Sequence, residues 1–229
     1  MTAGRDVLEI SGPDAESFLQ GQLSQDITVL GPSESAWSFV LQPQGKVDAL
    51  VRVTRVTGER WRLDVDAGFG DAVAARLQRF KLRVKADIEP APSDDVPPLF
   101  DDERARITAG WPSMGAELTE KTIPAETGLV DTTVSFTKGC FTGQELVARI
   151  DSRGGNVPRH LRGIRLAGSD APVGSEVVVD GKAVGVLTSV AGDIALAYVT
   201  RDVAPPADAI VRWAGGEVTA RIEVLPLES

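Results

Sequence analysis

Residues 36–67 read AWSFVLQPQGKVDALVRVTRVTGERWRLDVDA, and this stretch decides the class of fold. Apolar and polar residues alternate along 36–42, 46–56 and 60–67, as they do in strands with one buried face. The segments PQG and TGE that separate them consist largely of residues that favour turns. The pattern therefore predicts three consecutive antiparallel strands.

Helical patterns occur on both sides of these strands. Residues 11–23 and 70–80 have apolar side chains at helical spacing, and residues 6–10 and 82–90 are expected to be short strands. Helices interleaved with antiparallel strands predict an α+β fold in which the helices cover one face of the sheet.

The character of the sequence changes after about Asn156. From there to residue 229 it consists of short strand-like segments joined by turn residues, and Asp180–Gly181 and Gly215–Gly216 are strong hairpin signals. Because no helical pattern of useful length interrupts these segments, residues 156–229 are expected to form a small, closed or nearly closed antiparallel β-barrel.

The remaining residues, 1–155, are expected to form the body of the protein. Within the body, the stretch around 90–103 is rich in proline and acidic residues and has no usable periodicity. Such a composition is typical of a linker or a surface crossing. The body is therefore expected to contain two subdomains that meet at this crossing.

Composition excludes several classes of function. The net charge of −9 argues against a broad nucleic-acid surface, which needs clustered lysine and arginine. No apolar run is long enough to span a bilayer. Arg5, Asp6 and Glu9 lie where a signal peptide would be apolar, so we expect a cytoplasmic protein.

A single cysteine, Cys140, and a single histidine, His160, limit the metal chemistry of this chain. An intramolecular disulfide is excluded. A self-sufficient zinc site or iron–sulfur cluster, which draws several such ligands from one chain, is not expected. A protein of this composition that handles a cluster lends it at most one thiolate.

Cys140 lies in the segment TKGCFTGQELVARI at residues 137–150. Thr142 and Glu145 have the spacing of a capping box, which predicts a helix capped by Thr142. Cys140 would then precede a helix N-terminus, where free N–H groups favour negative charge, and Lys138 adds a cation. Both effects would lower the pKa of the thiol and favour the thiolate, the nucleophilic and metal-binding form.

The flanking residues bear on two interpretations of this cysteine. Most free cysteines are small buried core residues. Gly139 and Gly143, however, would allow the backbone to approach a ligand closely or to adopt a positive φ, and residues 142–145 are too polar for a core strand. The local sequence alone therefore supports a functional thiol and an inert core residue about equally.

The segment KGCFTGQELVARI at 138–150, followed by RGG, resembles the signature K-G-C-[FY]-x-G-Q-E of the YgfZ family. Members of this family are folate-binding relatives of the aminomethyltransferase (T-protein, GcvT) of the glycine cleavage system. Weaker similarity, in the expected order, covers nearly the whole chain at residues 14–27, 41–50, 111–118, 123–129 and 173–190. The resemblance implies a GcvT-like body of antiparallel sheet and helices with a C-terminal antiparallel β-barrel.

The resemblance also implies which residues form the site. Lys138 and Cys140 match the signature lysine and cysteine on which the activity of the family is thought to depend. The residues expected to bind the cofactor, tetrahydrofolate or a folate derivative, are Glu126, Gly139, Gly143, Gln144, Glu145, Arg149 and Arg153. No metal site is implied in this chain.

Three of these assignments have a chemical rationale. Glu126 matches the position where T-protein-like folds hold the pterin, and an ionised carboxylate accepts two parallel N–H bonds from an aminopterin ring. The glutamyl tail of folate is anionic, so Arg149 and Arg153 are candidates to bind it. An ordinary solvated surface role is at least as well supported for each arginine.

The chain departs from the aminomethyltransferases at one functional position. Those enzymes have an aspartate in the strand after the turn that PQGK resembles, whereas the matching positions here hold Ala49 and Leu50. Asp48 is displaced by one residue, and a one-residue shift on a strand turns the side chain to the opposite face. Aminomethyl transfer by that mechanism is therefore not favoured.

The leading hypothesis is a tetrahydrofolate-binding accessory protein in iron–sulfur cluster assembly or repair that uses a single reactive cysteine. Its partners would be a folate and iron–sulfur client or assembly proteins, without a membrane or nucleic acid. One alternative is a folate-dependent one-carbon (aminomethyl) transferase. Another is a non-catalytic folate-binding scaffold or sensor in which Cys140 is buried and unreactive.

Overall fold

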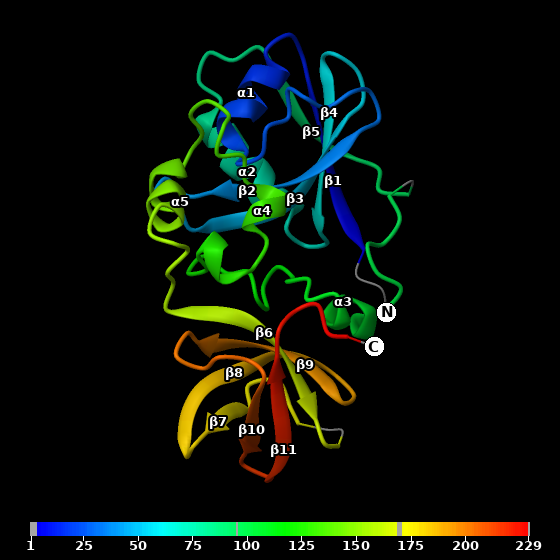
Figure 1. The fold of residues 1–229 in the computed structure, drawn as a ribbon. Coiled ribbons are helices and arrows are strands. Elements are labelled where there is room, and N and C mark those ends of the chain that lie inside the picture. Colours follow the sequence, from blue (N-terminus) through cyan, green and yellow to red (C-terminus); the bar gives the residue numbers. More distant parts are fainter. Residues whose placement is uncertain (1–3, 95, 169–170, 229) are drawn as a thin grey trace.

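The computed structural model describes residues 4–94, 96–168 and 171–228, and it consists of a sheet with helices above a barrel (Figure 1). The sheet has antiparallel strands in the order β2-β3-β4-β1-β5. These strands are β1 (Arg5–Ser11), β2 (Ser35–Leu41), β3 (Val47–Arg55), β4 (Arg60–Asp66) and β5 (Asp87–Ala91). The three strands predicted within residues 36–67 are β2, β3 and β4, and the predicted α+β class is confirmed.

Two helices cover one face of this sheet, as the sequence predicts. They are α1 (Ala15–Gln22) and α2 (Gly70–Phe80). Leu19 of α1 and Leu77 of α2 are fully buried in a cluster that includes Trp61 of β4. Burial of apolar surface of this kind is the dominant favourable term in folding.

The strand expected at residues 82–90 is shorter than predicted. β5 begins at Asp87 and pairs with β1, while residues 82–86 are irregular. The reason is that Lys85 pairs with the start of α1. Its carbonyl accepts the N–H of Asp14, and its own N–H donates to the Asp14 carboxylate at 2.8 Å. The backbone N–H and carbonyl of Lys85 therefore bond to the start of α1 and are not available for strand pairing.

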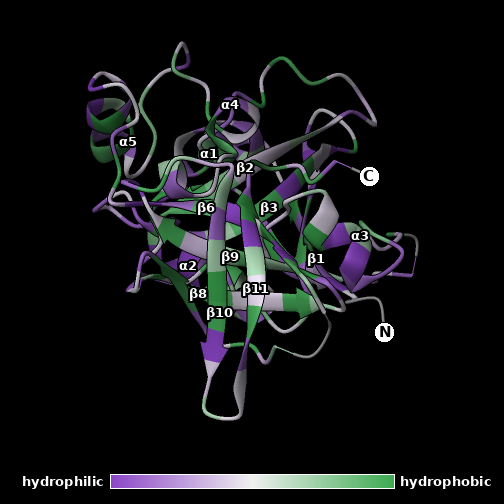
Figure 2. Cartoon of the chain, turned by 60° about the horizontal axis from the view of Figure 1, so that its bottom comes forward, coloured by the Kyte–Doolittle hydropathy of each residue, from purple (hydrophilic) through white to green (hydrophobic). Residues whose placement is uncertain are grey.

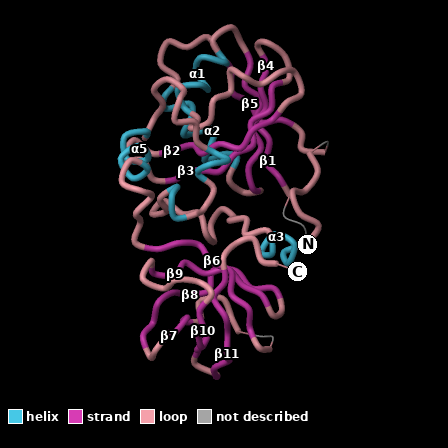
Figure 3. The backbone as a smooth tube through the Cα atoms, viewed as in Figure 1, coloured by secondary structure: helices cyan, strands magenta, loops and turns pink. Residues whose placement is uncertain are grey.

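The opposite face of the sheet is covered by the chain that follows it, in which helices are short and loops are long (Figure 3). The helical segments are α3 (Glu103–Thr108), the 3₁₀ turn η1 (Pro124–Glu126), α4 (Val130–Thr133) and α5 (Gln144–Asp151). Leu50 of β3 packs on this face against Val134 and Val147. Both faces of the sheet are therefore buried.

The C-terminal strands close into the predicted antiparallel barrel. They are β6 (Arg159–Leu166), β7 (Glu176–Val179), β8 (Lys182–Ala191), β9 (Ile194–Thr200), β10 (Ala207–Trp213) and β11 (Gly216–Glu223). Their order is β10-β11-β6-β9-β8-β7, and pairing of β10 with β7 closes the barrel. Figure 2 shows hydrophobic stretches along these strands. Asp180 and Gly181 both have positive φ in the predicted β7–β8 turn.

A buried charge network joins the barrel to the chain above it. The Glu117 side chain is buried, and its carboxylate accepts hydrogen bonds from Arg106 of α3 at 3.1 Å and from the hydroxyl of Ser189 in β8 at 2.6 Å. Arg106 also donates to the Ser189 hydroxyl, and the hydroxyl of Tyr198 in β9 donates to the Glu117 carbonyl. One carboxylate thus connects α3 with the barrel.

Replacing this carboxylate should weaken the fold. We expect Glu117→Gln to lower the free energy of unfolding by about 2 to 4 kcal/mol, because Arg106 would be left buried without one of its charged partners. Urea denaturation followed by circular dichroism measures the change. Glu120→Gln, at an exposed position nearby, is the matched control and should change the value by no more than about 0.5 kcal/mol. Equal stability of the two variants would contradict this role.

Candidate functional site

Lys138 anchors the cysteine-bearing segment to the end of α1. Its Nζ atom donates hydrogen bonds to the carbonyl oxygens of Gln20, Leu23 and Gln25 at 2.7, 2.8 and 2.8 Å. Carbonyls at the C-terminal end of a helix lack partners within the helix and favour a cation. Lys138 therefore holds residues 135–143 in place through three hydrogen bonds that its ammonium group donates.

Further contacts hold the same segment against the loop after α1. The hydroxyl of Ser24 donates to the carbonyl of Thr133 at 2.6 Å, and the side-chain amide of Gln25 donates to the carbonyl of Thr132. The N–H of Thr142 donates to the carbonyl of Gly21 at 3.0 Å. The loop after α1 and the signature segment thus form one hydrogen-bonded unit.

Burial acts on the charge of Lys138. It lowers the pKa of this ammonium group to about 8, and the nearby carboxylate of Asp26 opposes the shift. At neutral pH the side chain is mainly protonated, and it can donate to all three carbonyls.

The helix after Cys140 begins differently from the prediction. α5 starts at Gln144, and its N-cap is Gly143, with φ of 82°, so the capping box expected from Thr142 and Glu145 is wrong. The Thr142 hydroxyl lies instead 3.4 Å from the carbonyl of Gly21. The helix start is set by the left-handed backbone at Gly143, which a side chain at this position would strain.

Gly143 also makes a close approach, to another part of the chain. A Cβ atom at this position would lie 2.5 Å from the carbonyl oxygen of Gln42, in the turn between β2 and β3. Gly45, in the same turn, approaches Leu146 of α5 equally closely. Of the two glycines that could adopt a positive φ, Gly143 does so and Gly139 does not, and Gly143 fits α5 onto the β2–β3 turn.

Cys140 is exposed at the surface of this segment. Its interpretation as a buried core residue is therefore wrong, whereas the function of a non-catalytic folate-binding scaffold or sensor stays a prediction. The neighbouring Gly139 is exposed too, with open space around its Cα. The thiol is accessible to a partner while Lys138 holds the backbone beside it.

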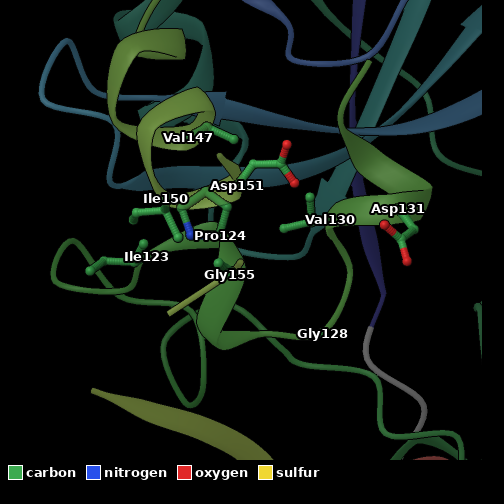
Figure 4. A pocket seen from close by; sticks show the side chains of 10 residues that line it. Ile123, Pro124, Gly128, Val130, Asp131, Val147, Ile150, Asp151 and Gly155 are labelled. Carbon is green, nitrogen blue, oxygen red and sulfur yellow. The ribbon is translucent and has the colours of Figure 1, made fainter. Parts of the chain in front are cut away.

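A hollow of about 210 Å³ lies between α5, η1 and α4 (Figure 4). Its apolar walls come from Ile123, Pro124, Val130, Val147 and Ile150, and its acidic residues are Asp131 and Asp151. This volume is smaller than the roughly 300 to 1,000 Å³ of pockets that enclose a drug-sized ligand. The hollow can therefore enclose a ring system while a longer tail stays outside.

Glu126 lies at the end of η1, but its carboxylate already has a partner. Arg159 of β6 donates to both carboxylate oxygens, at 3.1 and 3.2 Å, and the Glu126 side chain is 3% exposed. The Arg159 guanidinium also lies over the ring of Tyr198 at 4.2 Å. Pterin binding by Glu126 stays a prediction, and it would require this ion pair to open.

The other residues expected to bind the cofactor lie around α5. The side-chain oxygen of Gln144 accepts the N–H of Phe141 at 3.1 Å, while Glu145 and Arg149 are exposed on the helix and Arg153 on the turn after it. Their roles toward a ligand stay predictions. Sequence reasoning missed Asp151, although its position four residues after Val147 places both on one side of the helix.

Asp48 lies on the opposite face of the sheet from the signature segment. Its carboxylate accepts a hydrogen bond from Arg76 of α2 at 2.9 Å. Leu50 packs on the other face, which carries α5, against Val147. The alternation is interrupted between them because Asp48 is the extra residue of a β-bulge, with Val47 paired to Leu41 and Ala49 to Val40. On the face of the sheet that carries α5, the position that matches the aspartate of the aminomethyltransferases is therefore occupied by the apolar Leu50.

Two general features of the described chain bear on function. None of its helices has both the length and the apolar character needed to span a membrane. Within the same described residues, no group of three or more histidine, cysteine, aspartate or glutamate side chains is arranged to hold a metal ion.

Sequence comparisons with known proteins match the barrel and about three quarters of the chain. Residues 159–224 match the family described as CAF17, C-terminal beta-barrel domain. The chain is 27% identical to an uncharacterized protein of Haemophilus influenzae, over 75% of each chain. It is 25% identical to a mitochondrial iron-sulfur cluster assembly factor IBA57 homolog of Chaetomium globosum, over 79% of this chain and 59% of that longer protein.

A solved structure shares the fold. The glycine cleavage system aminomethyltransferase T of Bartonella henselae superposes with a TM-score of 0.84 and 17% identity, over 98% of this chain and 84% of that chain. At this identity the likeness concerns the fold, including the sheet-and-helix body and the barrel.

A glycine pair tests the fit of α5 on the β2–β3 turn. We expect Gly143→Ala to lower the free energy of unfolding by at least about 2 kcal/mol, because it combines a positive φ with a backbone clash. Gly139→Ala is the matched control. Its φ is not positive and nothing lies near its Cα, so it should stay within about 0.5 kcal/mol of the wild type. Thermal and urea unfolding measure both values, and an unaffected Gly143→Ala protein would contradict the contact.

The burial of Lys138 can be tested by titration. In NMR titrations of ¹³C-labelled protein, one lysine should titrate near pH 8, whereas exposed lysines titrate at about 10.4. The titration near pH 8 should be absent from the Lys138→Met variant. Between these values the unfolded chain binds more protons than the folded chain. The free energy of unfolding of the wild type, relative to Lys138→Met, should therefore rise as pH increases through this window. Titration of every lysine above pH 10 would exclude the shift.

Proposed function

We propose that the chain belongs to the YgfZ-like branch of the GcvT superfamily and, on that premise, that it is a tetrahydrofolate-binding accessory protein in iron–sulfur cluster assembly or repair. Its partners in this proposal are a folate and iron–sulfur client or assembly proteins, in the cytoplasm. The fold is shared with an aminomethyltransferase, and a cluster assembly factor is among the relatives.

The observation that carries the proposal is the accessibility of Cys140 on an anchored backbone. The thiol is exposed, and Lys138 fixes the segment two residues before it. A thiolate is a ligand for the iron of such clusters. Because this chain has one cysteine, Cys140 would supply one ligand, and the partner protein would supply the others.

The hollow beside α5 fits one part of tetrahydrofolate. Its apolar walls suit the faces of a pterin, and its size leaves the glutamyl tail outside. Bound tetrahydrofolate would supply a reduced pterin whose nitrogens carry one-carbon groups. The residues of this chain would enclose the ring and keep water from it, and exposed Arg149 and Arg153 are the candidates to bind the tail.

A second candidate function is aminomethyl transfer, which the shared fold favours. The placement of Asp48 weighs against it, because its carboxylate is paired with Arg76 on the far face of the sheet. Turnover of methylenetetrahydrofolate with an amine donor would establish this second function.

Complementation tests the role of the thiol. In a strain that lacks this protein, we expect wild-type protein to restore the activity of iron–sulfur enzymes and Cys140→Ser to restore less than about a tenth of it, since a hydroxyl is a far poorer iron ligand than a thiolate. Ser135→Ala, a polar side chain in the same segment, is the control for disturbance of the segment. Cys140→Ser should retain wild-type thermal stability, because the side chain is exposed. Full restoration by Cys140→Ser would exclude the thiol role.

A further inference from the structure

We infer that Asp151, and not Glu126, is the carboxylate that holds the 2-amino-4-oxopyrimidine edge of a ligand in the hollow beside α5. This inference rests on the proposed function, since the ligand of that chemistry is the pterin of tetrahydrofolate. It assigns the recognition of the ring to a residue outside the signature segment.

The position of Asp151 is the first argument. It is the last residue of α5 and lines the hollow together with Val147 and Ile150 of the same helix. Figure 4 shows its carboxylate extending from α5 toward Val130. Asp131 lines the hollow from α4 and lies farther from α5 than Val130 does in this view. The Asp151 carboxylate therefore extends from α5 toward the α4 side of the hollow.

The second argument is the absence of a competing partner. Among the residues that the structure describes, the Asp151 carboxylate makes no ion pair and accepts no hydrogen bond from a side chain or backbone group. Both oxygens of Glu126, in contrast, accept from Arg159. A ligand can bind Asp151 without breaking an existing contact, whereas binding to Glu126 would leave a half-buried guanidinium without its carboxylate.

The third argument is the chemistry of the whole hollow. Its apolar side chains can pack on both faces of a flat ring. A free carboxylate at one edge accepts two parallel N–H bonds, from an amino group and the neighbouring ring nitrogen. The two acidic residues and the net charge of −9 disfavour a phosphate or carboxylate inside the hollow. These features together select a flat, uncharged heterocycle with adjacent N–H donors.

Two ligands share this donor edge, the pterin of folates and the guanine base. Calorimetry with tetrahydrofolate and with guanosine therefore separates the sources, and the proteins to compare are the wild type, Asp151→Asn and Asp131→Asn. The last variant makes the same change of charge on the other acidic residue of the hollow, in α4. All three proteins should have similar melting temperatures, because both aspartates are exposed.

We expect the affinity of wild type for tetrahydrofolate to fall by about tenfold to a hundredfold in Asp151→Asn, as for the loss of a charged hydrogen-bonded pair. Asp131→Asn should stay within about threefold of wild type. A folate analogue that lacks the 2-amino group keeps only the ring N–H, so its affinity should fall less between wild type and Asp151→Asn than that of tetrahydrofolate does.

The outcomes distinguish this inference from the function on which it rests. Wild-type binding of tetrahydrofolate that Asp151→Asn leaves unchanged would overturn the inference and leave the folate function standing. Binding of guanosine alone, lost in Asp151→Asn, would support the carboxylate and overturn the folate function. Binding of neither ligand to the wild type would overturn both.

Discussion

One ammonium group determines the geometry of the candidate site. The charge of Lys138 satisfies three carbonyls that the end of α1 and the following loop leave unpaired, so the signature segment and the first helix of the fold are held as one unit. The contacts of Ser24, Gln25 and Thr142 support the same segment on either side of Cys140, and Lys138 supplies the charged contact nearest to the thiol. A reactive side chain at the surface needs such support, because exposure removes the packing that normally fixes a side chain.

The other side of the same segment is fixed by backbone contact. Gly143 and Gly45 let α5 approach the β2–β3 turn more closely than any side chain would permit. The helix therefore has a defined distance from the sheet, and the hollow between α5, η1 and α4 follows from that spacing. The stretch from Lys138 to Gly143 therefore positions both features. Its first residue, Lys138, holds the backbone beside the thiol, and its last residue, Gly143, places the helix that borders the hollow.

The fold could be predicted where the determinants are local. Alternation along residues 36–67 and the turn residues Asp180–Gly181 reflect neighbours in the sequence, and both gave the observed strands. The site depends on contacts between distant residues. The partners of Lys138 lie more than a hundred residues earlier, and the carbonyl that defines the position of Gly143 belongs to Gln42. No local pattern carries that information, so the capping box was the wrong explanation for α5.

The closure of the barrel limits how a partner protein can bind. Pairing of β7 with β10 leaves the barrel strands in the described part of the chain without an open edge, and residues 23–24 bond along the outer side of β2. The remaining edge, β5, contains Pro90 and the acidic Asp87 and Glu89, which disfavour the addition of a foreign strand. Main-chain pairing with a partner protein is therefore disfavoured at β5 and in the described part of the barrel, so that side chains would provide the selectivity there.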